Sequence, residues 1–125
     1  MNNLKFRAWD KKLQITGTVS NIDLEYEEVT FYIDDEEELE TCQPFEDVEI
    51  MQSTGLLDKN GKEIFEGDIV QGVFSENHEV VWRKEEGCWV IQTLGTIGLA
   101  ELAKYNKMFE VIGNIYEDKE LLENE

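Results

Sequence analysis

Lysine and arginine are absent from a long central stretch of this sequence. No basic residue occurs from Leu13 to Asp58, whereas that segment holds 14 of the 29 Asp and Glu residues. The rest of the chain carries all 11 basic and 15 acidic residues, so most of the net charge of −18 lies in this one segment. Such a region repels nucleic-acid phosphates and attracts cations or basic proteins, so we expect no direct nucleic-acid binding. A base-stacking platform of Trp9, Trp82 and Trp89 would lack the basic groove it needs, and we expect these side chains in the core.

Long apolar runs are absent as well, and cysteine is scarce. No segment approaches the roughly 20 apolar residues that a membrane-spanning helix needs, and the N-terminus shows no basic-then-apolar signal pattern. We therefore expect a cytoplasmic protein with no membrane partner. The two cysteines, Cys42 and Cys88, lie far apart and form no Cys-x-x-Cys pair. This predicts buried free thiols in a reducing compartment and no zinc site.

Catalytic side chains are equally scarce. His78 is the only histidine, and no serine or cysteine forms a recognised nucleophile motif with it. A lone histidine beside Glu79 at the start of a strand is expected to be exposed rather than to act as a general base or metal ligand. We therefore predict no catalytic residues and a protein that is not an enzyme. An enzyme with an unrecognised site stays open as an alternative.

No metal or cofactor site is indicated. Asp58, Asn60 and Glu63 superficially resemble a calcium loop, but an EF-hand needs more oxygen ligands before its glycine and a glutamate six residues after it. The glycines of the same region lack the order of a phosphate-binding loop and precede no helix. We therefore expect turns at these positions and no cofactor.

Apolar and polar residues alternate along most of the chain, which is the pattern of β-strands with one buried face. A helix is indicated over residues 98–105 and a helical turn over residues 117–123. The sequence predicts a mainly β fold, a single domain over residues 1–125 that forms a bulged, partly open antiparallel β-barrel-like structure with one or two short helices. The predicted strands cover residues 4–9, 13–19, 22–26, 29–33, 48–51, 69–74, 80–82, 88–91 and 109–116, with a bulge at Gly113.

Two turns follow closely in the stretch Thr54–Val70, which reads TGLLDKNGKEIFEGDIV. Asparagine and glycine tolerate the positive φ that a tight reversal needs, so the first turn is a hairpin turn. The second turn feeds a strand that begins at Ile69. The residues predicted to form these structural turns are Asp58, Asn60, Gly61, Gly67 and Asp68.

The densest acidic run of the chain lies between residues 34 and 40, where six of seven residues are acidic. Neighbouring like charges repel within a regular element, so the run is predicted to be an exposed loop with at most a short helical turn. It is the candidate partner-binding face, although a solvated surface that serves only solubility has the same composition. Its members are Asp34, Asp35, Glu36, Glu37, Glu38 and Glu40.

Three motifs carry a family resemblance. The central stretch, the opening KFRAWD (Lys5–Asp10) and the closing EVIGNIYED (Glu110–Asp118) followed by ELL resemble the YopX family of phage and prophage proteins. The resemblance spans nearly the whole chain and implies a phage-borne protein with a bulged antiparallel β-barrel-like fold. It implies no agreed biochemical role.

Charge and resemblance together predict a phage or prophage accessory protein that acts in the bacterial host by binding another protein. The partner is expected to present a basic surface, or to be a second copy of the chain. An alternative is an acidic nucleic-acid mimic that blocks a DNA- or RNA-binding protein.

Overall fold

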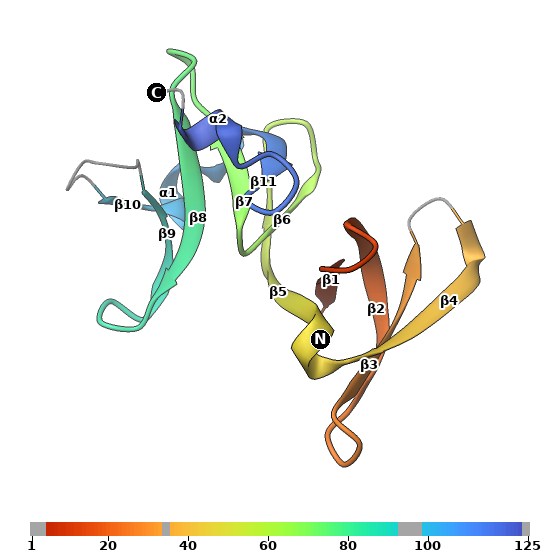
Figure 1. Cartoon of the computed structure of the whole chain (residues 1–125). Coiled ribbons are helices and arrows are strands. Elements are labelled where there is room, and N and C mark those ends of the chain that lie inside the picture. Colours follow the sequence, from red (N-terminus) through yellow and green to blue (C-terminus); the bar gives the residue numbers. More distant parts are fainter. Residues whose placement is uncertain (1–4, 34–35, 93–98, 124–125) are drawn as a thin grey trace. The chain divides into compact units, whose positions relative to one another are not determined.

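The computed structural model describes residues 5–33, 36–92 and 99–123. The chain divides into two compact units, Met1–Gln52 and Ser53–Glu125. In chain order the elements (Figure 1) are β1 (Phe6–Asp10), β2 (Ile15–Asp23), β3 (Glu28–Ile33), β4 (Glu36–Pro44), the 3-10 helix η1 (Phe45–Asp47), β5 (Val48–Leu57), β6 (Glu63–Phe65), β7 (Asp68–Gln71), β8 (Asn77–Arg83), β9 (Cys88–Gln92), β10 (Leu99–Glu101), α1 (Leu102–Tyr105), η2 (Asn106–Met108), β11 (Glu110–Asn114) and α2 (Glu120–Glu123).

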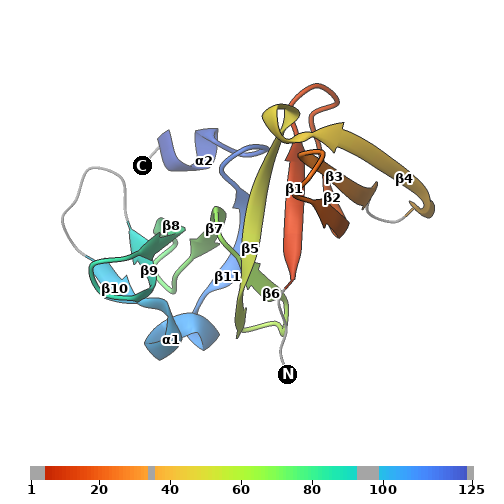
Figure 2. The ribbon, with the colours of Figure 1, turned by 90° about the horizontal axis from the view of Figure 1, so that it is seen from below.

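The first unit is an antiparallel sheet with the strand order β4-β3-β2-β1-β5. Figure 2 shows β5 alongside β1, where Ala8 is paired with Ile50. The ladder between β2 and β3 shifts register between Val19 and Asn21, so Ser20 forms a bulge that bends β2. Strand β5 is the last strand of this unit, and its second half, from Ser53 onward, pairs with β6 in the second unit.

The core of the first unit is small and built from alternate strand positions. Because side chains of a strand point to opposite faces in turn, Val29 and Phe31 of β3 share the buried face. Burying a side chain of this size contributes roughly 1.5–3 kcal/mol. The buried members are Ala8, Val29, Phe31 and Val48, and the partly buried Val19, Phe45 and Ile50 pack against them.

The second unit contains an antiparallel sheet with the strand order β10-β9-β8-β7-β11. Strand β11 shifts register between Val111 and Gly113 where it pairs with β7. The unit has its own core, made of Ile64, Val70, Val80, Ile91, Leu102, Phe109 and Val111, with Leu56, Trp89 and Ala100 packed against it.

The predicted fold class is confirmed. Every strand pairing among the described residues is antiparallel, the sheets are open, and the helices are short. The hairpin of β8 and β9 and the bulge at Gly113 are confirmed as well. The single-domain boundary stays a prediction.

Two predicted strand segments are wrong because a turn begins earlier than the alternation suggests. Strand β2 ends at Asp23, so Leu24 and Tyr26 lie in a turn and are 78% and 70% exposed. Strand β7 ends at Gln71, which leaves Val73 and Phe74 in the next turn, 67% and 87% exposed. In both places apolar residues continue a β-like pattern past the last backbone pairing.

The acidic run is not a loop over its described part. Residues Glu36–Glu40 belong to β4, in which Glu36 is paired with Ile33 and Glu40 with Tyr32 of β3, with a register shift between the two pairs. An edge strand can carry a run of charged residues, because one of its sides has no neighbouring strand. The helix predicted over residues 98–105 is likewise partly wrong, because Leu99–Glu101 pair with β9 as β10 and only Leu102–Tyr105 are helical.

The predictions for three reactive side chains are also wrong, since the two thiols were expected to be buried and the histidine to be exposed. Cys42 is a free thiol on the exposed face of β4, and the free thiol of Cys88 is half-buried. His78 is mostly covered, with 16% of its side chain exposed. None of the described helices is long and apolar enough to cross a membrane.

Candidate functional site

The predicted acidic face lies on the edge strand β4 of the first unit. Asp34 and Asp35 are outside the described residues, and Glu36, Glu37 and Glu38 follow on the backbone of β4. Glu40 is exposed, and its carboxylate accepts a hydrogen bond of 3.2 Å from the hydroxyl of Ser20 on β2. The acidic run therefore borders the bulge of β2 rather than standing apart in a loop.

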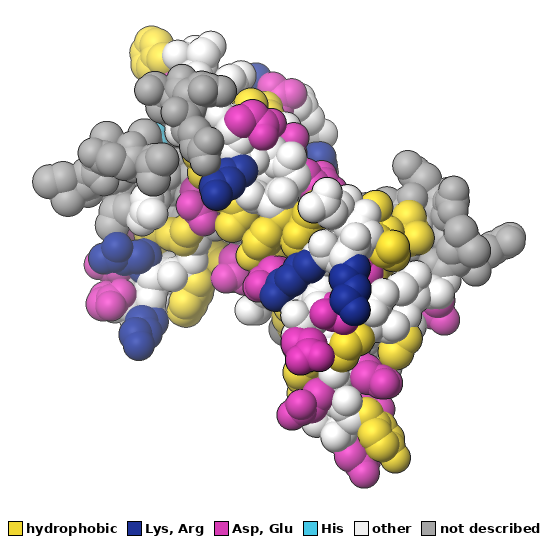
Figure 3. Space-filling view, viewed as in Figure 1, with side chains coloured by type: hydrophobic (Ala, Val, Ile, Leu, Met, Phe, Trp, Pro, Cys, Tyr) yellow, Lys and Arg dark blue, Asp and Glu magenta, His cyan; other side chains and the backbone are white. Residues whose placement is uncertain are grey.

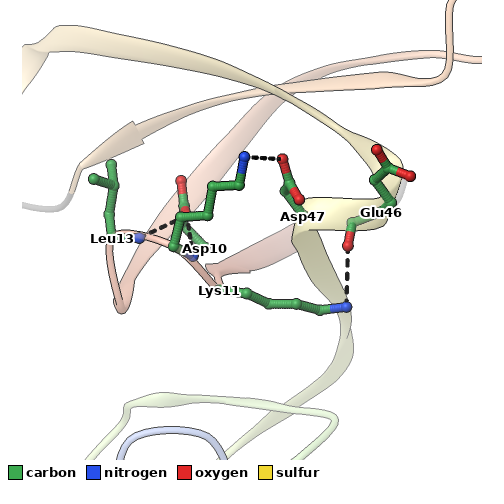
Figure 4. Close-up of polar contacts among 6 residues, drawn as sticks. Asp10, Lys11, Leu13, Glu46 and Asp47 are labelled. Carbon is green, nitrogen blue, oxygen red and sulfur yellow. Dashed lines mark hydrogen bonds and ion pairs between the residues drawn. The ribbon is translucent and has the colours of Figure 1, made fainter.

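Lys11 and Lys12 pair with carboxylates outside the acidic run. In the turn between β1 and β2, Lys12 Nζ lies 3.2 Å from Asp47 and Lys11 Nζ lies 3.2 Å from the carbonyl oxygen of Glu46. Figure 4 shows Lys11 directed at Glu46. Lys11 Nζ also lies 3.1 Å from Glu49. Both cations thus face η1 and the start of β5.

Asp10 fixes the position of that turn. Its carboxylate is fully buried, and Oδ1 accepts hydrogen bonds of 2.9 Å from the backbone amides of Lys12 and Leu13. An aspartate that accepts amides two and three residues further on forms a side-chain turn that replaces strand pairing. The turn therefore directs the two lysines toward η1.

A second acidic feature lies at the other end of β2, in the turn Asp23–Glu28, which we call the hairpin tip. The exposed carboxylates of Glu25, Glu27 and Glu28 surround the exposed Leu24 and Tyr26. In Figure 1 the β2–β3 hairpin ends in a projecting loop, and Figure 3 shows acidic and hydrophobic side chains together at that end. The hairpin tip thus combines an apolar centre with an acidic surround.

The hairpin tip is held by hydrogen bonds. Asp23 Oδ1 accepts bonds of 3.0 Å from the amides of both Glu25 and Tyr26. Glu27 adopts a positive φ of 55°, and its carbonyl oxygen accepts a 2.9 Å bond from the amide of Phe45, which packs on the core. The exposed side chains of the hairpin tip therefore extend from a backbone that hydrogen bonds hold in place.

The predicted strands over residues 22–26 and 29–33 imply this hairpin with a turn at Glu27–Glu28, but the turn begins at Leu24. Its start was misplaced because Leu24 and Tyr26 continue the alternation of β2. The signal that could have found it is Asp23, since an aspartate that starts a polar stretch favours a side-chain turn.

The residues predicted to form turns in the central stretch have the following geometry. Gly61 and Gly67 have φ values of 83° and 85°. Asp58 Oδ1 accepts the amides of Asn60 at 2.8 Å and Lys62 at 2.9 Å. Asp68 is fully buried, and its Oδ2 accepts the amide of Phe65 at 2.8 Å. These hydrogen bonds stabilise the two turns.

Asp58 also contacts a distant strand, since its Oδ2 accepts the amide of Val111 at 2.9 Å. Burial alone would raise the pKa of Asp58, but the three amide donors and the charge of Lys62 bring the pKa below its ordinary value. The ionised carboxylate is therefore the form that this structure favours.

The carboxylate of Glu79, also in the second unit, has a pKa shifted in the opposite direction. Burial raises the pKa of Glu79, and the negative charge of Glu66 raises it further. Glu79 belongs to β8, next to His78, whose ring meets the edge of Phe109 with 5.5 Å between centroids. His78 Nε2 lies 3.6 Å from Glu76, a distance too long for a direct hydrogen bond.

The aromatic residues divide between core and surface. Trp89 packs on the core of the second unit, as predicted, and Trp9 is half-buried. Trp82 is 49% exposed and contacts Trp89 edge-on, with 5.2 Å between ring centroids. Across residues 5–33, 36–92 and 99–123, no three His, Cys, Asp or Glu side chains are grouped to hold a metal ion.

Comparison with known proteins gives a family and a structural neighbour. The family model described as YopX protein matches residues 5–123. The crystal structure of protein EF1440 from Enterococcus faecalis is similar with a TM-score of 0.64 and 28% sequence identity, over 98% of this chain and 99% of that one. No curated protein matches the chain.

Proposed function

The chain belongs to the YopX family, and we propose that it is a non-enzymatic phage or prophage accessory protein that binds a basic surface of another protein. The acidic side of the first unit is its binding surface. This surface comprises β4 and the hairpin tip.

The observation that carries the proposal is the separation of charge within the first unit. Lys11 and Lys12 are engaged by Glu49 and Asp47, on the start of β5 and on η1, and among the side chains that the structure describes neither lysine forms an ion pair with the acidic run or the hairpin tip. The carboxylates of Glu25, Glu27, Glu28 and Glu40 are exposed, and the sequence around them, from Leu13 to Asp58, contains no Lys or Arg. Such an uncompensated field raises association rates with a basic partner and weakens as salt is added.

The test compares two variants with equal changes in net charge. The first replaces Glu36, Glu37, Glu38 and Glu40 of β4 with Gln. The control replaces four exposed glutamates of the second unit with Gln, namely Glu85, Glu86, Glu101 and Glu120. Both variants and the intact chain are used to capture proteins from a lysate of the bacterial host, and association with the captured protein is then measured at several salt concentrations.

We expect the β4 variant to associate about 10-fold or more slowly at low salt, with a smaller change in dissociation, because steering acts on encounter. The control variant should associate like the intact chain. Equal association rates for the β4 variant and the intact chain would show that these carboxylates serve solubility alone.

A second candidate is the acidic nucleic-acid mimic, favoured by the uninterrupted absence of cations from Leu13 to Asp58. It demands a nucleic-acid-binding partner. Excess duplex DNA or RNA should then displace the chain from that partner, and a failure to compete would leave only the more general binding role.

A further inference from the structure

Leu24 and Tyr26 are among the most exposed large apolar residues that the structure describes, at 78% and 70%. A large apolar side chain that projects into water contributes no burial energy to the stability of the fold. Single exposed apolar residues are ordinary, but two on one short turn form a small apolar patch.

The backbone beneath this patch is already ordered. The carboxylate of Asp23 holds the amides of Glu25 and Tyr26, and the amide of Phe45 holds the carbonyl oxygen of Glu27. An ordered loop loses little conformational entropy when it binds, so its side chains are suited to act as anchors. Tyrosine adds a large contact area with few rotatable bonds.

The charge around the patch identifies the chemistry of a complementary surface. Asp23, Glu25, Glu27 and Glu28 are next to the patch in the sequence, and no Lys or Arg occurs in that segment. A purely apolar partner would strip water from these carboxylates without replacing it, which is unfavourable. Lysine or arginine at the rim of a pocket would meet them instead.

We propose that the hairpin tip is an anchor that inserts Leu24 and Tyr26 into an apolar pocket rimmed by Lys and Arg on the partner protein. This inference rests on the proposed binding function and deepens it. The carboxylates of β4 steer the encounter, and the hairpin tip holds the complex. Anchors of this kind dominate binding energy because they lie in fully desolvated pockets with a polar rim.

The first test places a photo-cross-linking phenylalanine analogue at position 26 of the full chain, in the bacterial host. The matched control places the analogue at position 74. Phe74 is also an exposed residue of a hairpin turn, and its backbone amide also donates to a carboxylate, that of Glu76. We expect a cross-link from position 26 to an apolar residue of one protein, with Lys or Arg beside it on that surface, and little from position 74. No cross-link at position 26, or an equal one at position 74, would overturn the inference.

The second test uses the partner protein that the cross-link identifies. It measures how fast this partner dissociates from the chain without the photo-cross-linking residue. Leu24→Ser with Tyr26→Ser should speed dissociation by about 10-fold or more and leave the salt dependence of association unchanged. Val73→Ser with Phe74→Ser is the control and should change neither. Unchanged dissociation in the hairpin-tip variant would refute the anchor, while slower association of the β4 variant would still support the proposed function.

Discussion

The carboxylate of Asp58 accepts a 2.9 Å hydrogen bond from the backbone amide of Val111, 53 residues further along the chain. The same carboxylate closes its own turn by accepting two local amides. A second link joins these segments, because the amide of Lys59 donates to the carbonyl oxygen of Phe109 at 2.9 Å. The central turn is therefore joined to the start of β11, which also pairs with β7.

Replacing Asp58 with Asn should lower the free energy of unfolding by about 1–3 kcal/mol. Asparagine has one acceptor oxygen, so its amide group would face at least one donor that the carboxylate now satisfies. Denaturant unfolding measures the change, with Glu120→Gln as a control that removes an exposed charge. A variant as stable as the intact chain would mean that water replaces the lost acceptor at no cost.

The contribution of Asp58 should also depend on pH, because its folded-state pKa is below its ordinary value of 3.8. A group with a lowered pKa stabilises the folded state fully above its unfolded-state pKa, and this stabilisation is lost as the pH falls through the folded-state pKa. The stability difference between the intact chain and Asp58→Asn should therefore be constant near neutrality and shrink in acid below about pH 4. A difference that stays constant in acid would contradict the lowered pKa.

The contribution of Glu79 to stability should depend on pH with the opposite sign. Its pKa is raised in the folded state by burial and by Glu66, so ionised Glu79 destabilises the fold above that pKa. Glu79→Gln should therefore raise the melting temperature at neutral pH, and the gain should disappear as the pH falls below the ordinary glutamate value of 4.5. Glu85→Gln, at an exposed site, is the control. A gain that persists in acid would point to packing rather than charge.

Two glycines should respond differently to a methyl group. At Gly61 the positive φ is the constraint, and nothing lies within 4 Å of an added Cβ. Gly61→Ala should cost about 1 kcal/mol and Gly61→Val about 1–3 kcal/mol, through backbone strain. At Gly17 an added Cβ would lie 2.2 Å from the backbone oxygen of Tyr32. Gly17→Ala should therefore cost more than Gly61→Ala, and thermal unfolding of both variants decides the order.

Salt should stabilise the whole protein. The acidic segment repels itself more in the folded chain than in the expanded one, and added ions screen that repulsion. The denaturant midpoint should be higher at about 300 mM than at about 20 mM NaCl. The β4 variant should show a smaller rise. A midpoint that does not move with salt would mean that the carboxylates are better compensated than their sequence suggests.

Local patterns predicted the parts of the fold that depend on neighbouring residues. The alternation around Val80 and Val90 predicted the β8–β9 hairpin, and Asn60–Gly61 predicted the first central turn. Gly113 marked the bulge, where an added Cβ would lie 2.4 Å from the carboxylate of Asp118. Each of these features is decided by sterics or hydrogen bonding within a few residues.

Other features depend on which strands become neighbours, and periodicity does not contain that information. The acidic run was predicted to be a loop because repulsion between its side chains was weighed without the backbone bonds that β3 supplies. The bond between Asp58 and Val111 joins two segments that no local pattern connects. The hairpin tip was hidden for a related reason, since an apolar residue predicts burial only where another element covers it.

The Asn60–Gly61 step has a consequence for the chemical ageing of the protein. In such a pair the glycine nitrogen can attack the asparagine side-chain carbonyl, because no glycine side chain obstructs the approach, and deamidation follows. In the folded turn the Gly61 amide is directed at the carbonyl oxygen of Asp58, 3.0 Å away, and the Asn60 amide is held by the Asp58 carboxylate. Deamidation should then proceed from the opened turn, so its rate in stored protein would report how often the turn between β5 and β6 opens.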